Sequence, residues 1–397
     1  MKVDGHPLTS IWLDVEDSTV VRAIDQRLLP HELVVATIST VEQMFDAIRD
    51  MLVRGAPLIG VAAAYGVYLA ALKAGEKTFH DDIQNACAYL LKSRPTAVNL
   101  QFALRRQGEL SKSATTRAEL IKMLLENANA IRQEEIEIGQ AIGAHGAELI
   151  KRIGERKQGQ PVHILTHCNA GWLCTVDWGT ATAPMYASFN NNIPVHVWVD
   201  ETRPRNQGAA LTAWELGQHG VSYTVIADNT GGHLMQNGMV DLVIVGTDRT
   251  CSNGDVTNKI GTYLKALAAK DNDVPFYVAA PSSSIDFDLP SGRDVPIEQR
   301  DIEEVKYATG RGDDGKTRRV LLTPENAHAA NYAFDVTPAR LVTGIITERG
   351  ICEASTEGLR RLFPNAEERR LPACESGLKA AGTKTNTTKT NTTKTKR

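Results

Sequence analysis

The sequence predicts an α/β protein, with an N-terminal mainly helical domain followed by a doubly wound domain on a parallel sheet. Apolar residues recur at helical spacing over residues 1–153, whereas from Pro161 onward short β-rich runs alternate with helical stretches. The length of 397 residues also fits two domains. We place them at residues 1–153 and 154–370, with the linker at 154–160 (GERKQGQ) and a low-complexity tail at 371–397.

The first predicted helix has a start signal and a stop signal. Ser39 followed by Glu42 fits a capping box, and the apolar residues that follow at helical spacing are Met44, Phe45, Ile48 and Leu52. We expect this helix to end at Gly55 and the next to begin around Pro57.

Three more N-terminal segments have helical patterns. The uncharged run of residues 55–72 is rich in Ala and Gly and has a proline near its start, so it predicts a buried core helix rather than a membrane span. Residues 81–92 and 115–151 combine apolar stripes with mixed charge on their outer faces.

Six β-rich runs predict the strands of the second domain: Val162–Thr166, Val195–Val199, Tyr223–Ala227, Leu242–Val245, Phe276–Ala279 and Leu341–Ile346. Helical patterns lie between them, for example Ala209–His219 and Lys259–Ala268. Ligands of open α/β sheets bind beyond the carboxyl ends of the strands, so the residues that follow each strand are the first candidates for a site.

The composition excludes several classes of protein. Lys and Arg total 44 against 47 Asp and Glu, a net charge of −3 that argues against a nucleic-acid partner. The six cysteines include no CxxC pair, and the N-terminus lacks the apolar segment of a signal peptide. We therefore expect a cytoplasmic protein without membrane contact. The last fifteen residues contain nothing apolar, so we expect them to be disordered.

Polar or reactive residues follow five successive predicted strands. In chain order these groups begin at His167-Cys168-Asn169, Asp200-Glu201, Asp228-Asn229, Gly246-Thr247-Asp248-Arg249 and Pro281-Ser282-Ser283. Any one of them could be an ordinary turn or helix cap, but five on one rim predict a site.

Cys168 and Asp248 carry the most chemistry among these groups. A helix N-terminus after Cys168 would lower the pKa of its thiol, although a small buried core residue fits the same position. Asp248 ends the apolar run LVIVG, and apolar walls would raise the pKa of its carboxyl enough for acid catalysis. The alternative for Asp248 is a cap on a helix after Arg249.

Metal and nucleotide chemistry fit the sequence less well. His163 and His167 are four residues apart along a strand, about 13 Å at ~3.3 Å per residue, too far to share one ion. The chain has no GxGxxG, GxxxxGK[ST] or GxSxG motif. A phosphate would instead be held by Arg54 and the backbone amides of Gly55 and Ala56 ahead of Pro57, with charge added by Arg94 and Lys259.

Eight motifs stand out along the chain: Arg54–Pro57, Ser93–Leu100, Thr166–Gly171, Val199–Pro204, Gln207–Ala209, Gly246–Arg249, Asn253–Asp255 and Asn258–Tyr263. With these motifs in this order, the chain resembles the methylthioribose-1-phosphate isomerase family of methionine salvage, and the resemblance runs from about residue 10 to 365. The wider superfamily includes ribose-1,5-bisphosphate isomerases and the regulatory subunits of translation initiation factor 2B.

The resemblance implies a Rossmann-like C-terminal domain, a homodimer and no cofactor or metal. It implies that Cys168 and Asp248 are the catalytic pair, and that the substrate is held by Arg54, Gly55, Ala56, Arg94, Gln207, Asn258 and Lys259. The reaction it implies turns 5-methylthioribose 1-phosphate into 5-methylthioribulose 1-phosphate, with Asp248 as acid to the ring oxygen and Cys168 as acid or base at C1 and C2.

Two alternatives remain at this stage. One is an isomerase of another pentose 1-phosphate, such as 5-deoxyribose 1-phosphate or ribose 1,5-bisphosphate. The other is a non-catalytic regulatory subunit, which would not need the Cys168 and Asp248 pair. Bulky residues at Trp172–Trp178, where smaller ones are common in the family, leave the choice of C5 substituent open; no extra cation for a second phosphate stands out there.

Overall fold

The computed structural model describes residues 1–94 and 97–365 and has a mixed α/β architecture around a seven-stranded sheet. The strand order is β18-β17-β12-β9-β6-β7-β8, and only β18 runs antiparallel to its neighbour. The bounds are β6 (Val162–Thr166), β7 (Val195–Asp200), β8 (Ser222–Ile226), β9 (Leu242–Val245), β12 (Phe276–Ala279), β17 (Gly344–Thr347) and β18 (Gly350–Cys352). The predicted strands are all present, although the last begins at Gly344 rather than Leu341.

Both faces of this sheet are covered by helices. Along β6 and β9, alternate side chains enter different apolar clusters: Ile164 lies in one cluster and Leu165 in the other. The first cluster includes residues of α5 (Arg117–Gly154) and α6 (Ala183–Asn190), and the second includes residues of α8 (Thr230–Gln236) and α9 (Thr262–Asp271). Strands buried on both faces need unbroken apolar runs, which explains LVIV at β9.

The N-terminal region begins with strands, which the prediction of a mainly helical domain did not include. A hairpin of β1 (Lys2–Val3) and β2 (His6–Pro7) precedes an antiparallel sheet of β3 (Ile11–Leu13), β4 (Val21–Ile24) and β5 (Val35–Ile38). In β4, Val21 and Ala23 are buried, while Arg22 points outward and its Nε donates to Asp14 at 2.7 Å. Strands of two to four residues carry too short an alternation to stand out from a sequence.

Five helices follow these strands: α1 (Val41–Arg49), α2 (Ala56–Ala71), α3 (Phe79–Leu91), α4 (Val98–Ser111) and α5 (Arg117–Gly154). The N-cap of α1 is Thr40 rather than Ser39, because its side chain accepts from the backbone N–H of Gln43 at 3.2 Å. The helix ends at Arg49, six residues before the expected Gly55.

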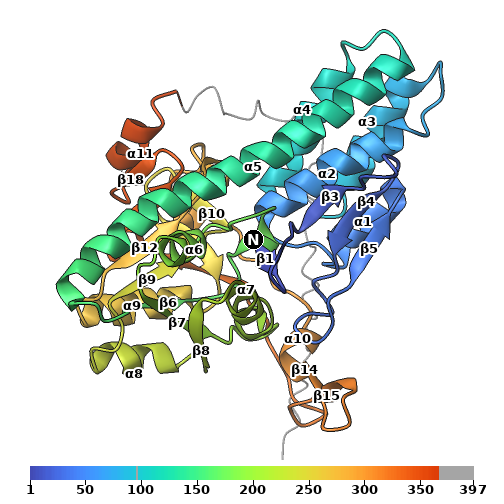
Figure 1. Cartoon of the computed structure of the whole chain (residues 1–397). Helices are drawn as coiled ribbons and strands as arrows, with labels where there is room; N and C mark the ends of the chain where they lie inside the picture. The colour runs from blue at the N-terminus through green and yellow to red at the C-terminus, as the bar shows by residue number, and fades with distance from the viewer. Residues whose placement is uncertain (95–96, 366–397) are drawn as a thin grey trace, which may run out of the picture.

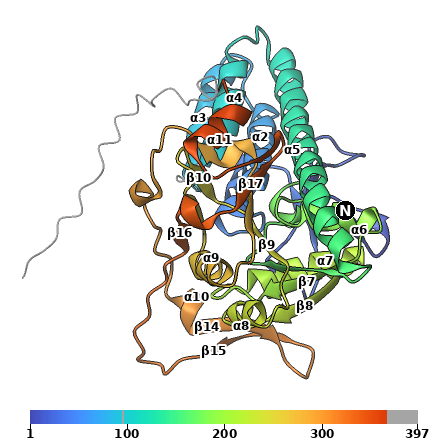
Figure 2. The same cartoon turned by 90° about the vertical axis from the view of Figure 1, so that its left-hand side faces the viewer.

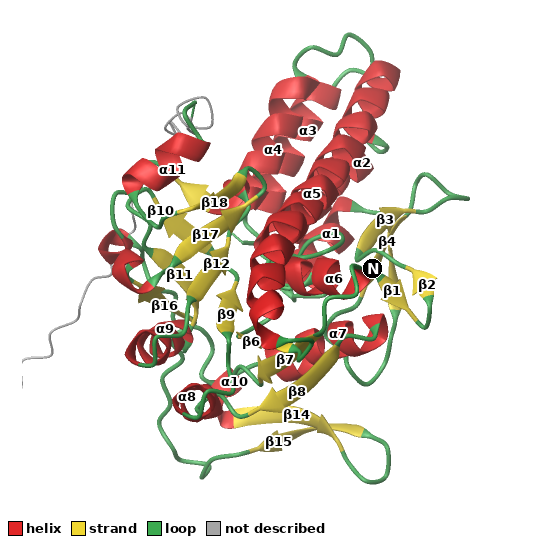
Figure 3. Cartoon of the chain, turned by 60° about the vertical axis from the view of Figure 1, so that its left-hand side comes forward, coloured by secondary structure: helices red, strands yellow, loops and turns green. Residues whose placement is uncertain are grey.

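The uncharged run forms α2, which is buried on nearly every side against α4 and α5. Among the described residues, no helix is long and apolar enough to cross a membrane. The 38 residues of α5 span about 57 Å at ~1.5 Å per residue, so this helix packs on α2 at one end and on α6 and β17 at the other. Figure 1 shows α5 running across the whole molecule, and Figure 3 shows α2–α5 side by side beyond the sheet.

The connections after β7 and β9 differ from the predicted pattern. The predicted helix 209–219 begins as a π-helical turn (Gly208–Thr212) and continues as α7 (Ala213–His219). Residue Lys259 ends a strand, β11 (Val256–Lys259), and α9 begins three residues later. The segment after Asp248 is β10 (Arg249–Cys251), so Asp248 does not cap a helix.

A second sheet and a hairpin complete the fold. The second sheet has the order β13-β10-β11-β16, with β13 at Ile285–Asp286 and β16 at Phe334–Thr337. The hairpin of β14 (Tyr307–Arg311) and β15 (Thr317–Leu321) follows the short helix α10 (Glu303–Lys306) and projects from the body (Figures 1 and 2). The last described helix is α11 (Thr356–Leu362). The predicted disordered tail lies outside the described residues.

Candidate active site

A cavity of about 270 Å³ lies where the carboxyl ends of β6 and β9 meet the N-terminus of α2 and the end of β11. It is lined by the whole set that the resemblance implied as catalytic pair and substrate contacts: Arg54, Gly55, Ala56, Arg94, Cys168, Gln207, Asp248, Asn258 and Lys259. The fold therefore gathers into one cavity groups that are up to 205 positions apart in the chain, from residue 54 to residue 259.

Not every predicted strand-end group reaches the cavity. The groups after β6 and β9 do, through Cys168 and Asp248, and the connection after β7 contributes Gln207. Of the group predicted after β12, Pro281 lines the cavity, whereas Ser282 and Ser283 do not. The pair after β8 does not line it: Asp228 accepts instead from the backbone N–H groups of Thr202 and Arg203, at 2.7 and 2.8 Å.

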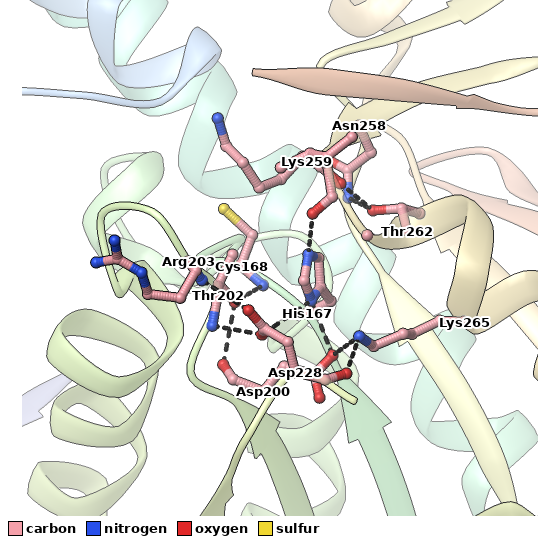
Figure 4. Close-up of polar contacts among 12 residues, drawn as sticks. His167, Cys168, Asp200, Thr202, Arg203, Asp228, Asn258, Lys259, Thr262 and Lys265 are labelled. Atoms are coloured by element: carbon pink, nitrogen blue, oxygen red, sulfur yellow. Dashed lines mark hydrogen bonds and ion pairs between the residues drawn. The ribbon is translucent and has the colours of Figure 1, made fainter. Parts of the chain in front are cut away.

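Cys168 is held by contacts on both sides of its backbone. Its N–H donates to Thr202 Oγ1 at 2.8 Å, and its carbonyl accepts from Thr212 Oγ1 at 2.8 Å. Its φ of +66° lies in the left-handed region, which a residue with a side chain adopts only when its surroundings hold it there. The thiol Sγ donates to Gln207 Oε1 at 3.5 Å (Figure 4 shows the Cys168 backbone contact).

Burial raises the pKa of the Cys168 thiol, more than the neighbouring Lys259 and Arg54 lower it. The expectation of a lowered pKa from a following helix is therefore wrong. Only a short 3-10 turn (Trp172–Cys174) follows, and its N-terminus does not offset the desolvation of a side chain that is 8% exposed. This shift favours the thiol over the thiolate at Cys168.

The Asp248 carboxyl faces the open cavity. The surrounding protein still desolvates this carboxyl, and the desolvation raises its pKa. Lys259, Arg54, Arg94 and Arg300 oppose this effect, because each favours the charged carboxylate. The backbone N–H of Asp248 donates to the carbonyl of Thr257 at 2.9 Å and so ties the end of β9 to β11. A carboxyl with a raised pKa and cations around it is suited to giving up a proton during a reaction.

Five basic residues line the cavity: Arg54, Arg94, Arg249, Lys259 and Arg300. Arg249 pairs with Asp286 at 3.5 Å, and Arg300, which the sequence did not point to, has its Nε 3.3 Å from Glu298 Oε1. Burial lowers the pKa of both Arg94 and Lys259. Arg300 lies on a loop between β13 and α10 without any periodic pattern, so no sequence signal could have singled it out.

The N-terminus of α2 faces the same cavity. Its N-cap, Gly55, has a φ of +100°, and a Cβ there would lie 2.4 Å from the carbonyl oxygen of Cys174. Only glycine fits this approach, and the residues at the start of α2, Gly55, Ala56 and Pro57, line the cavity. Such an N-terminus favours an anion.

The titratable cluster behind Cys168 contains His167, Asp200 and Asp228, whose ligand atoms lie within 4.8 Å of one another. However, Asp200 Oδ2 accepts from His167 Nδ1 at 2.8 Å and pairs with Lys265 Nζ at 3.1 Å, and His167 Nε2 lies 2.8 Å from the carbonyl of Ile260 (Figure 4). With the Lys265 ammonium already among these oxygens, the cluster does not fit a cation.

The bulky residues of the loop after β6 do not shape the cavity. Trp172 is fully buried in the core and packs near Trp214, with 6.0 Å between ring centroids. From this loop, Ala170, Cys174 and Thr180 line the cavity, whereas Trp172 and Trp178 do not.

Comparison with known proteins gives consistent matches over most of the chain. The model of the initiation factor 2 subunit family matches residues 52–354. Curated relatives named methylthioribose-1-phosphate isomerase include one from Desulfosudis oleivorans, 54% identical over 91% of this chain and 98% of the relative. Another, from Brucella anthropi, is 56% identical over 92% of this chain and 99% of the relative.

Solved structures with similar folds have two kinds of title. The 5-methylthioribose 1-phosphate isomerase of Pyrococcus horikoshii has a TM-score of 0.80 and 39% identity, over 90% of this chain and 96% of that one. A protein of A. fulgidus titled translation initiation factor eIF-2B, subunit delta, has a TM-score of 0.77 and 36% identity, over 90% of this chain and all of that one. The fold is thus shared by proteins titled as enzymes and as translation factors.

Proposed function

We infer that this chain, which belongs to the initiation factor 2 subunit family and to its methylthioribose-1-phosphate isomerases, converts 5-methylthioribose 1-phosphate into 5-methylthioribulose 1-phosphate. The curated relatives with this name are 54–56% identical to the chain, and the match covers almost their whole length. The observation that carries the proposal is that the Cys168 thiol, the Asp248 carboxyl and five basic residues line one cavity. A non-catalytic subunit would have no use for that combination.

The phosphate is held by the cationic side of the cavity. Arg54, Arg94 and Lys259 surround it, and the amides of Gly55 and Ala56 at the N-terminus of α2 point at its oxygens. Gln207 and Asn258 line the same cavity, and their amides are suited to hydrogen-bond the sugar hydroxyls. The negative charge of the bound phosphate also favours the ionised forms of Arg94 and Lys259, whose pKa values burial lowers.

Asp248 opens the ring. Because C1 carries a phosphate ester, the ring cannot open as a free hemiacetal does, so the bond between C1 and the ring oxygen must break with the phosphate in place. Protonated Asp248 donates its proton to the ring oxygen, which leaves as the C4 hydroxyl, and C1 becomes an electron-poor centre stabilised by its phosphate oxygen. The raised pKa of Asp248 supports this role, since it keeps the proton available.

Hydrogen then moves from C2 to C1. In a hydride route the C2 hydrogen travels with its electron pair, C2 becomes the ketone, and the proton of its hydroxyl returns to the Asp248 carboxylate. In an enediolate route Cys168 removes the C2 hydrogen as a proton and C1 is protonated afterwards. The raised pKa of the Cys168 thiol favours the hydride route, with Cys168 as a hydrogen-bond donor beside C1 and C2.

The test is turnover of 5-methylthioribose 1-phosphate by purified protein in D₂O, followed by proton and phosphorus NMR, with no added metal or cofactor. We expect the 1-phospho-ketose with both C1 hydrogens retained, and loss of turnover in Cys168→Ser and Asp248→Asn. Deuterium at C1 would show that the C2 hydrogen leaves as a proton, so that the enediolate route applies and not the hydride route. No turnover from folded protein would refute the proposed function.

Arg300 favours one alternative substrate. Ribose 1,5-bisphosphate has a second phosphate that requires an extra cation, and Arg300 supplies one at the cavity. Conversion of this bisphosphate in the same assay, with none of the methylthio sugar, would move the assignment to that substrate.

The finer points of organisation are proposals as well. We propose that residues 154–370 form a Rossmann-like domain after an N-terminal domain of residues 1–153, because α5 ends and β6 begins across residues 154–162. We also propose a homodimer in the cytoplasm that needs no cofactor or metal. Light scattering on purified protein tests the dimer, and retention of turnover after dialysis against a chelator tests the metal.

A further inference from the structure

Glu215 is a buried carboxyl close to the candidate phosphate groups, and no step above uses it. It lies on α7, is fully buried and does not line the cavity. Its Oε1 accepts from the backbone N–H of Leu173 at 2.7 Å and from Asn169 Nδ2 at 3.1 Å, while its Oε2 lies 3.3 Å from the hydroxyl of Tyr186. None of these partners is a cation, and burial raises the pKa of Glu215 to about 7.

The contact with Asn169 continues to Arg54. Asn169 Nδ2 donates to both Thr212 Oγ1 and Glu215 Oε1, each at 3.1 Å, which uses both hydrogens of the amide. The amide oxygen Oδ1 is thereby turned to accept from Arg54 Nη1, and the Asn169 backbone carbonyl accepts from Arg54 Nη2 at 3.0 Å. If the Asn169 amide were flipped, its NH₂ group would face the Arg54 guanidinium and the hydrogen bond between them would be lost. The Glu215 carboxyl prevents this flip and so keeps the Asn169 oxygen available to Arg54.

The contact with Leu173 continues to the N-terminus of α2. Leu173 lies in the 3-10 turn Trp172–Cys174. That turn packs so tightly on Gly55 that a Cβ there would lie 2.4 Å from the Cys174 carbonyl oxygen. The turn is therefore the wall against which the start of α2 is placed.

We propose that Glu215 is a positioning residue for phosphate recognition, holding Arg54 through Asn169 and the start of α2 through the Trp172–Cys174 turn. The proposal rests on the proposed function only in that the ligand carries a phosphate. Glu215 itself does not touch the ligand. A glutamine at this position keeps an acceptor oxygen for Asn169 and Leu173, whereas a methionine keeps the length and leaves both buried donors without their acceptor.

A double-mutant cycle separates this role from a general structural one. Calorimetry measures inorganic phosphate binding to the wild type, Glu215→Gln, Glu215→Met, Arg54→Met and the Arg54→Met/Glu215→Met double variant, and the isomerase assay gives KM and kcat. We expect Glu215→Met to weaken phosphate binding and raise KM about tenfold, with Glu215→Gln within about twofold of wild type. In the Arg54→Met background the same change should cost less than about threefold, because its main effect acts through Arg54. The matched control is Tyr186→Phe, which removes only the contact on Oε2 and should leave phosphate binding unchanged.

Two results would overturn the proposal. One is an equal loss of phosphate binding in both backgrounds; the other is wild-type binding by a folded Glu215→Met protein. If Glu215→Met does not fold, Asn169→Leu cuts the same connection one residue nearer to Arg54 and must show the same dependence on Arg54. Because phosphate binding is measured without turnover, a failure of the proposed function leaves this test intact.

Discussion

Replacement of Asp248 by asparagine is the perturbation that most sharply separates catalysis from binding. The carboxamide has almost the same shape as the carboxyl, so the cavity keeps its form, but it has no ionisable proton for the ring oxygen. A positioned general acid contributes roughly 10²–10⁴-fold to a reaction rate. We expect kcat to fall about a thousandfold, which corresponds to about 4 kcal/mol in the activation barrier.

The charges of the cavity set the expected change in KM. Asp248 is an acid among Arg54, Arg94, Lys259 and Arg300, and whatever fraction of it is ionised repels the substrate's phosphate. Asparagine removes that repulsion, so KM should stay the same or fall. The Asp248→Asn variant therefore loses kcat without losing affinity, which is the signature of a group that acts in the transition state.

The pH dependence follows from the direction of the pKa shift. Burial raises the pKa of Asp248, and the reaction needs its protonated form, so kcat should fall as the pH rises through that raised value. The same shift means that the ionised carboxylate destabilises the folded state relative to the protonated one. Asp248→Asn should accordingly be at least as stable as wild type at neutral pH, with the two converging below the ordinary pKa of Asp.

Stopped-flow or NMR rate measurements from acid to neutral pH, with thermal melts of both proteins, check these expectations. A folded Asp248→Asn protein with kcat within a few-fold of wild type would refute the assignment of Asp248 as the acid. A rise in KM with unchanged kcat would make Asp248 a binding group instead.

Three further predictions concern the groups around the cavity. Arg300→Met should raise KM about tenfold, because it removes one of the cations that attract the substrate's phosphate. Arg293→Met, at an exposed position of the same loop, should leave KM unchanged. Equal KM values for the two variants would show that Arg300 does not bind the substrate. Lys265→Met should lower the free energy of unfolding by about 3–5 kcal/mol in chemical denaturation, because it leaves the buried Asp200 carboxylate without its lysine partner. A loss below about 1 kcal/mol would contradict this ion pair. Gly55→Ala should weaken phosphate binding by calorimetry, because its methyl would meet a backbone carbonyl at 2.4 Å; unchanged binding would show that the start of α2 does not face the phosphate.

The sequence predicted the elements whose patterns are strongest. The strands at 242–245 and 276–279 have the predicted bounds, because strands buried on both faces need continuous apolar runs that end abruptly at polar residues. The N-terminal strands were missed because they are short and one of their faces is polar. The end of α1 was misplaced because the chain leaves the helix through a turn at Asp50 and Met51, where Met51 has a φ of +60° and no glycine marks the stop.

The candidate site divides in the same way. Motif residues such as Cys168, Asp248 and Arg54 were predicted because they follow strands or start a helix, and the fold brings them to one cavity. Arg300 and Glu215 were not predicted, because one lies on an irregular loop and the other on the inner face of a helix. Only the packing shows that Arg300 lines the cavity and that Glu215 contacts Asn169 at its wall.

The isomerisation itself is tested with 5-methylthioribose 1-phosphate labelled with ¹³C at C1, followed by carbon NMR with the wild-type protein. We expect the C1 signal to change from a ring carbon bearing one hydrogen to a CH₂ group that is still coupled to phosphorus, while a ketone forms at C2. A C1 signal that stays unchanged, or one that becomes an aldehyde with release of phosphate, would refute the proposed reaction.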